Sequence, residues 1–219
     1  MPAGRVGMAE RSTTRLVQRL RALTPSWQVS HREARWITEQ QARLLLAESG
    51  ITSPPVSEHI VTGLAGIHVY PLSPMPVKGL FGASKPSARG GDILIDGSLP
   101  RPERRITLLH ELKHIIDGGH TVKPHRTGTQ SASEGLCTTF ALSVLIPEAW
   151  LRADWQAGWR NITRLAERYQ VPTTAVEQRL HTLGLQTRRP PPKRLSPNCQ
   201  WYAYPGYAAK QRGDHKHVA

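Results

Sequence analysis

Residues 108–120 read "LLHELKHIIDGGH", and the H-E-x-x-H spacing within them limits the fold more than any other feature of the chain. Histidines four residues apart share one face of an α-helix, so His110 and His114 can approach one metal ion together. Imidazole nitrogens bind Zn²⁺ at about 2.0–2.1 Å. Apolar residues flank the motif at helical spacing, so we expect it to lie on a packed helix.

Glu111 follows the first histidine, where its carboxylate can reach a water held by the metal. Zinc lowers the pKa of such a water to about 7, and a neighbouring carboxylate can accept its proton as the water attacks a carbonyl. The motif therefore predicts one Zn²⁺ per chain and metal-assisted hydrolysis, with Glu111 as the catalytic base.

Two residues are candidates for the third metal ligand. His120 would give H-E-x-x-H-x-x-D-G-G-H, which is close to the metzincin pattern, but Asp117 stands where that pattern has glycine. A Met-turn also has no donor, because all three methionines precede the motif: Met1, Met8 and Met75. Glu134, on the next predicted helix, would complete a His₂Glu set. However, "SASE" at 131–134 also reads as a capping box, so the residues alone leave both candidates open.

Composition predicts a cytoplasmic globular protein. A chain of 219 residues with 38% hydrophobic residues can form one core, and its 18 glycines and 18 prolines indicate several loops. There is no run of 18 apolar residues and no apolar N-terminal segment, so neither a membrane span nor a secretory signal is expected. Cys137 and Cys199 are too few for a disulfide framework.

The net charge of +13 is concentrated at the two ends of the chain. Residues 1–50 carry +4 and residues 51–186 carry +3, whereas the last 33 residues carry +6. Basic terminal segments account for this distribution better than a nucleic-acid-binding core does.

The periodicity of the sequence predicts an α+β fold, with a small mixed or antiparallel sheet packed on the H-E-x-x-H helix and a helical C-terminal part. Helices are expected over 10–23, 30–50, 57–65, 99–117 and 131–147, and again within 148–185; strands are expected over 66–72, 77–84 and 92–98. We expect four regions. These are a basic helical extension (1–29), a catalytic core (30–147), C-terminal helices (148–186) and a basic, Pro-rich, disordered tail (187–219).

From about residue 34 to 185 the chain resembles the ImmA/IrrE family of zinc metallopeptidases. "DILIDGSLPRPERRITLLHELKH" is similar to the family's strand and Arg-rich stretch that lead into the active-site helix. "EGLCTTFALSVLIP" is similar to its E-x-x-A-x-x-F-A-x-x-L-L-M-P helix, and "LAERYQVPTTAVEQRLHTLGL" to its C-terminal helical pair.

The resemblance implies that His110, His114 and Glu134 are the metal ligands and that Glu111 is the base. The chain departs from the family at Lys113, where glycine is usual, and at 137–138, where Cys-Thr replaces Ala-Asn. Neither departure is expected to contact a ligand, and Cys137 is expected to pack as a small apolar residue. The alternative for Cys137 is a redox-sensitive or metal-bound thiol.

The same resemblance implies an intracellular endopeptidase that cleaves a helix-turn-helix (Xre-like) repressor and so switches on a mobile element or a stress regulon. We expect the strand over 92–98 to offer an edge to which a substrate adds as a further β-strand.

Four further residues are candidates for secondary roles in the site. Asp117, one turn beyond His114, is a candidate to orient that imidazole. The side chains that could polarise the substrate carbonyl or stabilise the oxyanion are His120, His125 and His181.

Residues 162–183 also read as a helix-turn-helix, although Gln170 stands where the turn usually has glycine. In a DNA-binding version the residues on the groove would be Thr173, Thr174, Gln178 and Arg179. The alternatives to a peptidase are therefore a DNA-binding regulator with a structural zinc and a protein that binds a repressor without cleaving it. Two packed helices that only share this geometry are the simpler interpretation.

Overall fold

A computed structural model describes residues 16–73, 75, 79–118 and 130–186. The predicted tail over 187–219, the start of the predicted first helix, His120 and His125 lie outside the described residues.

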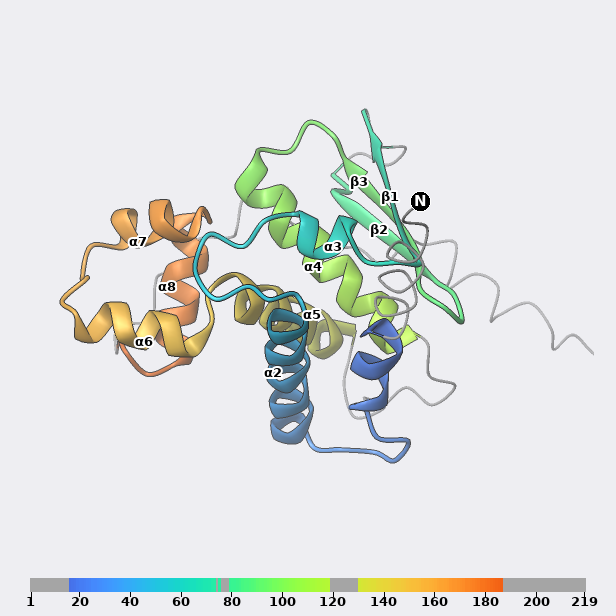
Figure 1. Ribbon diagram of the computed structural model, residues 1–219, viewed down its shortest axis with the longest axis horizontal. Coiled ribbons are helices and arrows are strands. Elements are labelled where there is room, and N and C mark those ends of the chain that lie inside the picture. Colours follow the sequence, from blue (N-terminus) through green and yellow to red (C-terminus); the bar gives the residue numbers. More distant parts are fainter. Residues whose placement is uncertain (1–15, 74, 76–78, 119–129, 187–219) are drawn as a thin grey trace, which may run out of the picture.

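Three short strands form one mixed sheet in the order β1-β3-β2. These are β1 (Ile67–Leu72), β2 (Gly82–Pro86) and β3 (Gly91–Asp96). β1 runs parallel to β3 and β2 runs antiparallel to it. The predicted α+β class with a small mixed sheet is confirmed (Figure 1).

β3 is the central strand, so the prediction that residues 92–98 offer a free edge is wrong. Alternation of apolar residues shows which face of a strand is buried and does not show which strands are its neighbours. Close backbone approach at glycines allows β1 to reach β3: the amide of Gly91 donates to the carbonyl of Gly66 at 2.8 Å. A Cβ atom at Gly90 would lie 2.0 Å from the Gly66 oxygen, which leaves space only for glycine. The edges of the sheet are therefore β1 and β2.

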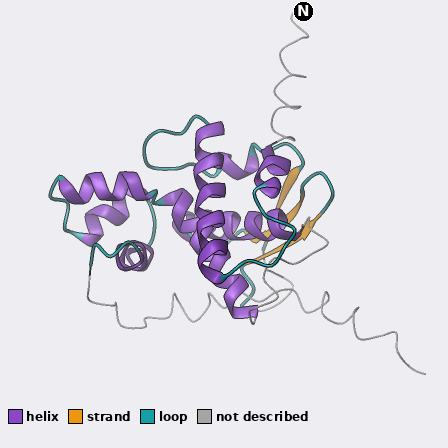
Figure 2. Ribbon diagram, turned by 90° about the horizontal axis from the view of Figure 1, so that it is seen from below, coloured by secondary structure: helices purple, strands orange, loops and turns teal. Residues whose placement is uncertain are grey.

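Helices, joined by loops, cover one side of the sheet (Figures 1 and 2). In chain order they are a helix over residues 16–22, α2 (His31–Glu48), α3 (His59–Thr62), α4 (Arg101–Gly118), α5 (Gln130–Leu145), α6 (Glu148–Gln156), α7 (Ile162–Tyr169) and α8 (Thr173–Thr182). The predicted ends of α2 are confirmed. Ser30 and Glu33 form a capping box, and Gly50 follows the C-cap in a left-handed conformation with φ of 65°.

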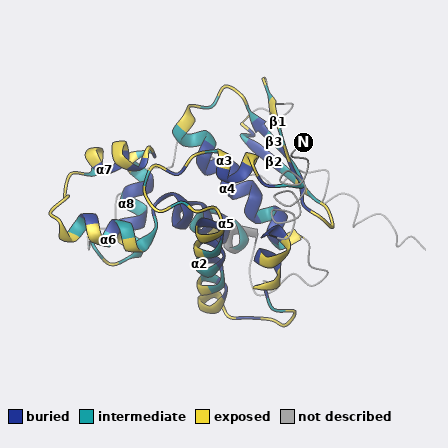
Figure 3. Ribbon diagram, viewed as in Figure 1, coloured by how far each residue is buried: buried dark blue, intermediate teal, exposed yellow. Residues whose placement is uncertain are grey.

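α4 is the central element of the fold, because it packs against the sheet and against α5. Eleven of its residues between 105 and 116 are buried, so burial extends around the whole helix (Figure 3). Polar side chains in this helix therefore have little access to water, and each needs a partner inside the protein.

The helix over residues 16–22 joins the N-terminal part of the chain to α4. Leu16, Val17 and Leu20 lie in the main hydrophobic core. The guanidinium of Arg21 donates to the carbonyls of Ala88 and Gly90 in the β2–β3 turn and to Ile115 in the last turn of α4, at 2.9–3.0 Å. A cation at the last carbonyls of a helix also stabilises its dipole. This part of the predicted extension thus belongs to the same packed unit as the motif helix.

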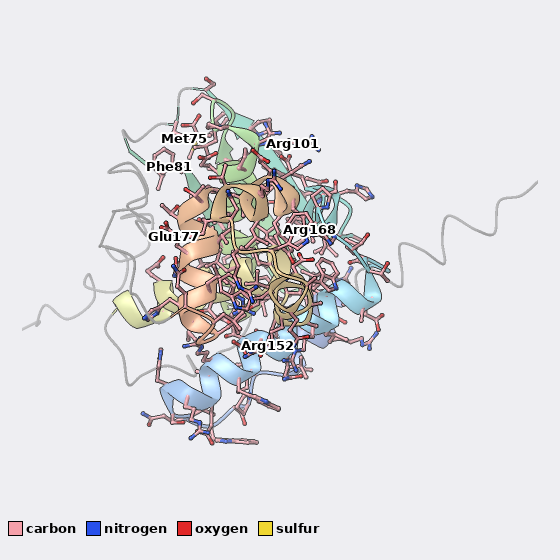
Figure 4. The ribbon with its side chains drawn as sticks, turned by 90° about the vertical axis from the view of Figure 1, so that its left-hand side faces the viewer. Met75, Phe81, Arg101, Arg152, Arg168 and Glu177 are labelled. Carbon is pink, nitrogen blue, oxygen red and sulfur yellow. The ribbon has the colours of Figure 1, made fainter. Side chains whose placement is uncertain are left out.

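α6, α7 and α8 form the end of the molecule away from the sheet (Figure 1). Arg105 of α4 donates to the carbonyls of Tyr169 and Gln170 at 2.6 Å and so holds the end of α7. Gln170 adopts a left-handed conformation with φ of 51°, so the turn forms without the usual glycine. Figure 4 looks onto this end of the molecule, with Arg168 of α7 and Glu177 of α8 labelled.

Within the described ranges, no single helix has the length and apolar content needed to cross a membrane. Taken together, the two helical segments Ser133–Leu145 and Glu148–Gln156, which are bent relative to each other, are long and apolar enough by length and composition alone.

Candidate metal centre

Two neighbouring helices bring three candidate metal ligands together. α4 supplies His110, which is buried, and His114, which is half-buried, and their Nε2 atoms lie 3.2 Å apart. α5 supplies Glu134, whose Oε2 lies 3.0 Å from His110 Nε2 and whose Oε1 lies 3.6 Å from His114 Nε2. All three side chains thus direct donor atoms to one point between the helices.

The spacing of these donors fits a tetrahedral zinc ion. Two donors bound at about 2.0–2.1 Å to a tetrahedral ion are separated by about 3.3–3.4 Å. The two histidine Nε2 atoms, 3.2 Å apart, lie close to that value. The Glu134 carboxylate places Oε2 at 3.0 Å from His110 Nε2 and Oε1 at 3.6 Å from His114 Nε2, so it can supply the third donor. A His₂Glu set leaves a fourth position for water or substrate, which is the arrangement of catalytic rather than structural zinc sites.

Without a metal, the three groups interact as an ion-paired cluster. Burial would raise the pKa of Glu134, but hydrogen bonds and charge from His110 and His114 outweigh it and hold the pKa at about 2. Burial would lower the pKa of His114, but Cys137, Glu134 and Glu111 raise it well above its ordinary value of 6.5.

Cys137 contacts His114, contrary to the expectation that this departure from the family pattern touches no ligand. Its sulfur lies 3.6 Å from Nδ1 of His114 and is fully buried. Burial raises the pKa of the thiol, against the opposing effect of His114. Sequence analysis could have found this contact from the spacing, since Cys137 lies three residues after Glu134 on one helical face.

Cys137 also offers a second possible donor set, because ligand atoms of His110, His114 and Cys137 all lie within 4.8 Å of one another. The sulfur contacts Nδ1 of His114, however, and His110 and Glu134 approach the other ring nitrogen. We therefore favour Glu134 as the third donor on the Nε2 side and treat the thiol as a neighbour of the imidazole.

Glu111 lies between the histidines and the sheet. Its side chain is buried and faces β2, where a Cβ atom at Gly82 would lie 3.0 Å from Glu111 Cγ and 3.2 Å from Oε1. Its negative charge also contributes to the raised pKa of His114. The Thr107 methyl would be closer still, at 2.6 Å, so the close packing of α4 beneath β2 at Thr107 and Glu111 requires glycine at position 82, a role that the sequence did not indicate.

The other predicted site residues lie in different surroundings. Asp117 accepts a hydrogen bond from the buried Lys113 ammonium at 2.6 Å, and the same ammonium donates to Gln41 at 2.8 Å. The atom that faces Nδ1 of His114 is the Cys137 sulfur, so the orienting role predicted for Asp117 gains no support. His181 is exposed on α8, outside the cluster.

The four predicted DNA-contact residues differ in exposure. Thr173 is exposed, and Thr174 and Gln178 are half-buried. The prediction for Arg179 is wrong, because its side chain is buried and its Nε donates to the carbonyl of Ile146 at 3.1 Å. This guanidinium holds α8 against the end of α5 and does not face solvent.

Comparisons with known proteins identify a matching family and a protein of similar fold. A family model described as the IrrE N-terminal-like domain, Peptidase M78, matches residues 64–181. The solved structure of a Mycobacterium tuberculosis transcriptional regulator is similar in fold, with a TM-score of 0.50 and 18% sequence identity. The similarity covers 70% of this chain and 58% of that one. Among curated proteins, no sequence matches the chain.

We predict that the metal-free protein loses stability as the pH rises above 6.5. His114 has a higher pKa in the folded than in the unfolded chain, so its contribution is complete below 6.5 and is lost as the pH passes the folded value. Glu134 acts in the opposite direction, and its contribution is lost only as the pH falls from 4.5 towards about 2.

Thermal unfolding in the presence of a chelator, measured from pH 6.5 upward, tests this prediction. The melting temperature should fall with increasing pH, and His114→Gln should reduce that slope. A melting temperature that stays constant or rises over the same interval would show that the imidazole is not held as the cation.

Proposed function

We propose, since the chain belongs to the Peptidase M78 family of IrrE N-terminal-like domains, that it is a zinc-dependent endopeptidase. The observation that carries the proposal is the convergence of His110, His114 and Glu134, with Glu111 held beside them under β2. The match covers more than half of the chain and includes all four residues.

In this proposal His110, His114 and Glu134 hold the zinc ion. A bound zinc supplies Lewis-acid activation of a water molecule and of the scissile carbonyl. Burial of His110 and half-burial of Glu134 exclude most competing water from the donor atoms, and the packing of α4 against α5 fixes their spacing.

Glu111 performs the proton transfers. Its carboxylate takes a proton from the attacking water and then passes it to the leaving amine nitrogen, acting first as base and then as acid. The position of Glu111 against β2 at Gly82 suits both steps, because a peptide added at the edge of β2 beside Gly82 would lie near the carboxylate.

The free edge of β2 is the proposed binding site for the substrate backbone. The Phe81 carbonyl accepts from Asp96, and the Ser87 amide donates to Gly90. In an antiparallel pair the hydrogen-bonding residues alternate, so 81, 83, 85 and 87 face β3, whereas 82, 84 and 86 face away.

Gly82 and Ser84 therefore direct their backbone groups to the side of β2 that has no partner strand among the described residues. Pro86 at the third such position agrees with this assignment, because proline is tolerated where an edge amide has no partner. A substrate that adds here as a strand is bound through its main chain, close to Glu111.

The substrate that we propose is a helix-turn-helix repressor of the Xre type, cleaved in the cytoplasm. Support for this finer statement comes from the ImmA/IrrE resemblance alone. The matched region spans 58% of the length of the similar solved structure, and that likeness therefore adds nothing to the identity of the substrate.

A DNA-binding regulator with a structural zinc is the second candidate. It is favoured by the left-handed turn at Gln170 between α7 and α8, with Thr173 exposed at the start of the second helix. Against it, Arg105 and Arg179 both hold this helical pair to the core through backbone carbonyls. Specific duplex binding with a steep dependence on salt would favour this candidate.

Glu111→Gln should remove cleavage and keep the metal. Loss of a general base costs about 10²–10⁴-fold in rate, and Gln preserves the shape of the side chain under β2. Cleavage of a purified Xre-type repressor and of a mixture of unstructured peptides, followed by mass spectrometry, gives the rate, and metal analysis gives the zinc content.

Glu103→Gln is the matched control, because it makes the same change two turns earlier on α4. Full cleavage by Glu111→Gln would contradict the peptidase mechanism. Unchanged repressor regulation in a cleavage-deficient Glu111→Gln would favour a protein that binds without cutting.

Ser84→Pro should weaken substrate binding without unfolding the sheet. The substitution removes the one Ser84 backbone donor that faces the free edge of β2, and the pairing with β3 does not use that amide. KM should rise by about tenfold, because a backbone hydrogen bond of about 1–1.5 kcal/mol is lost, while the melting temperature changes little. Ser87→Pro, which removes an amide that bonds to Gly90, should instead lower the melting temperature. An unchanged KM for Ser84→Pro would exclude this edge as the binding site.

A further inference from the structure

α5 approaches the imidazole of His114 on two sides. Oε1 of Glu134 lies 3.6 Å from Nε2, and the sulfur of Cys137 lies 3.6 Å from Nδ1. Residues three apart on a helix share one face, so a single turn of α5 supplies both groups. The ring is therefore contacted at both of its nitrogen atoms by the same helix.

The two nitrogen atoms have different requirements once a metal is bound. A neutral imidazole carries one N–H and one lone pair, and a metal on Nε2 uses the lone pair of that atom. The proton then resides on Nδ1, where a hydrogen-bond acceptor is needed to keep the tautomer and the ring orientation. Sulfur is only a weak hydrogen-bond acceptor, but the Cys137 sulfur is the atom that lies within reach of Nδ1, at 3.6 Å.

Among the described residues, the nearest carboxylate on α4, Asp117, pairs with a different partner. The Asp117 carboxylate accepts from the buried Lys113 ammonium at 2.6 Å, and Lys113 is further held by Gln41 at 2.8 Å. Cys137 is fully buried, so a water molecule has little access to the space that its sulfur occupies. Of the two departures from the family pattern, Lys113 bonds to the Asp117 carboxylate and Cys137 contacts the His114 imidazole.

We propose that Cys137 is a positioning residue for His114, whose Nδ1–H donates to the sulfur so that the Nε2 lone pair stays directed at the metal. The inference rests on the proposed metal site and adds a residue that does not itself bind the ion. The proposed interaction is a hydrogen bond from the His114 Nδ1–H to the neutral Cys137 thiol, and no proton is transferred between the two groups.

The test uses the full-length chain loaded with Zn²⁺ or with Co²⁺. Cys137→Ala removes the acceptor, and Ser143→Ala is the matched control, since it removes one buried polar atom from the same helix. We expect zinc affinity, measured by competition with a chelating dye, to fall about tenfold in Cys137→Ala and to stay unchanged in Ser143→Ala. The visible spectrum of bound Co²⁺ should shift only in Cys137→Ala, because only that change reorients a ligand.

A second measurement needs no variant. In the zinc-loaded wild type, long-range ¹H–¹⁵N correlation should show the His114 proton on Nδ1. A proton-free Nδ1 would overturn the proposal, and so would equal affinities and spectra for Cys137→Ala and wild type. A sulfur-to-cobalt charge-transfer band would overturn it too, since Cys137 would then be a ligand.

The outcomes separate this inference from the function on which it rests. A wild-type chain that binds neither ion contradicts both claims. A wild-type chain that binds zinc normally, beside an equally tight Cys137→Ala, removes only the role given to Cys137.

Discussion

The packing of α5 against α4 is the contact on which the rest of the structure depends. Alone, the motif helix carries two imidazoles and a carboxylate on neighbouring faces, which is an incomplete set of donors for zinc. The contact with α5 adds Glu134 at 3.0 Å from His110 and Cys137 at 3.6 Å from His114. It also buries α4 on the side opposite the sheet, so that these polar groups meet one another in place of water.

Buried charges hold the surrounding elements to this helix pair. Arg21 joins the β2–β3 turn to the last turn of α4, and Arg105 joins α4 to the end of α7. Each guanidinium bonds to backbone carbonyls at a helix end or a turn, where such groups lack partners within their own element. Burial lowers the pKa of Arg105 to about 10, which still leaves it charged at neutral pH. These contacts fix the placement of α4 relative to β2, and therefore the distance between Glu111 and the proposed substrate edge.

Much of the fold followed from periodicity and capping signals. The spacing around His110 and His114 predicted a packed helix, and Ser30 with Glu33 predicted the start of α2; both are confirmed. The neighbours of a helix or strand were harder to predict. The spacing of apolar residues identifies the face of an element that is buried, but it does not identify the element that covers that face. For that reason the free edge was assigned to β3 rather than β2, and Arg179 was listed among the groove residues of the alternative DNA-binding version although it lies against Ile146. The ligand set was narrowed to Glu134 only by the family resemblance, since spacing alone left His120 open.

The central claim is that one zinc ion lies between α4 and α5, held by His110, His114 and Glu134. Its most direct test is anomalous diffraction at the zinc absorption edge from crystals of the zinc-loaded protein. We expect a single strong peak within about 2.0–2.2 Å of both Nε2 atoms and of a Glu134 carboxylate oxygen. A peak coordinated by Cys137 or His120 in place of Glu134, or no peak between the two helices, would contradict it.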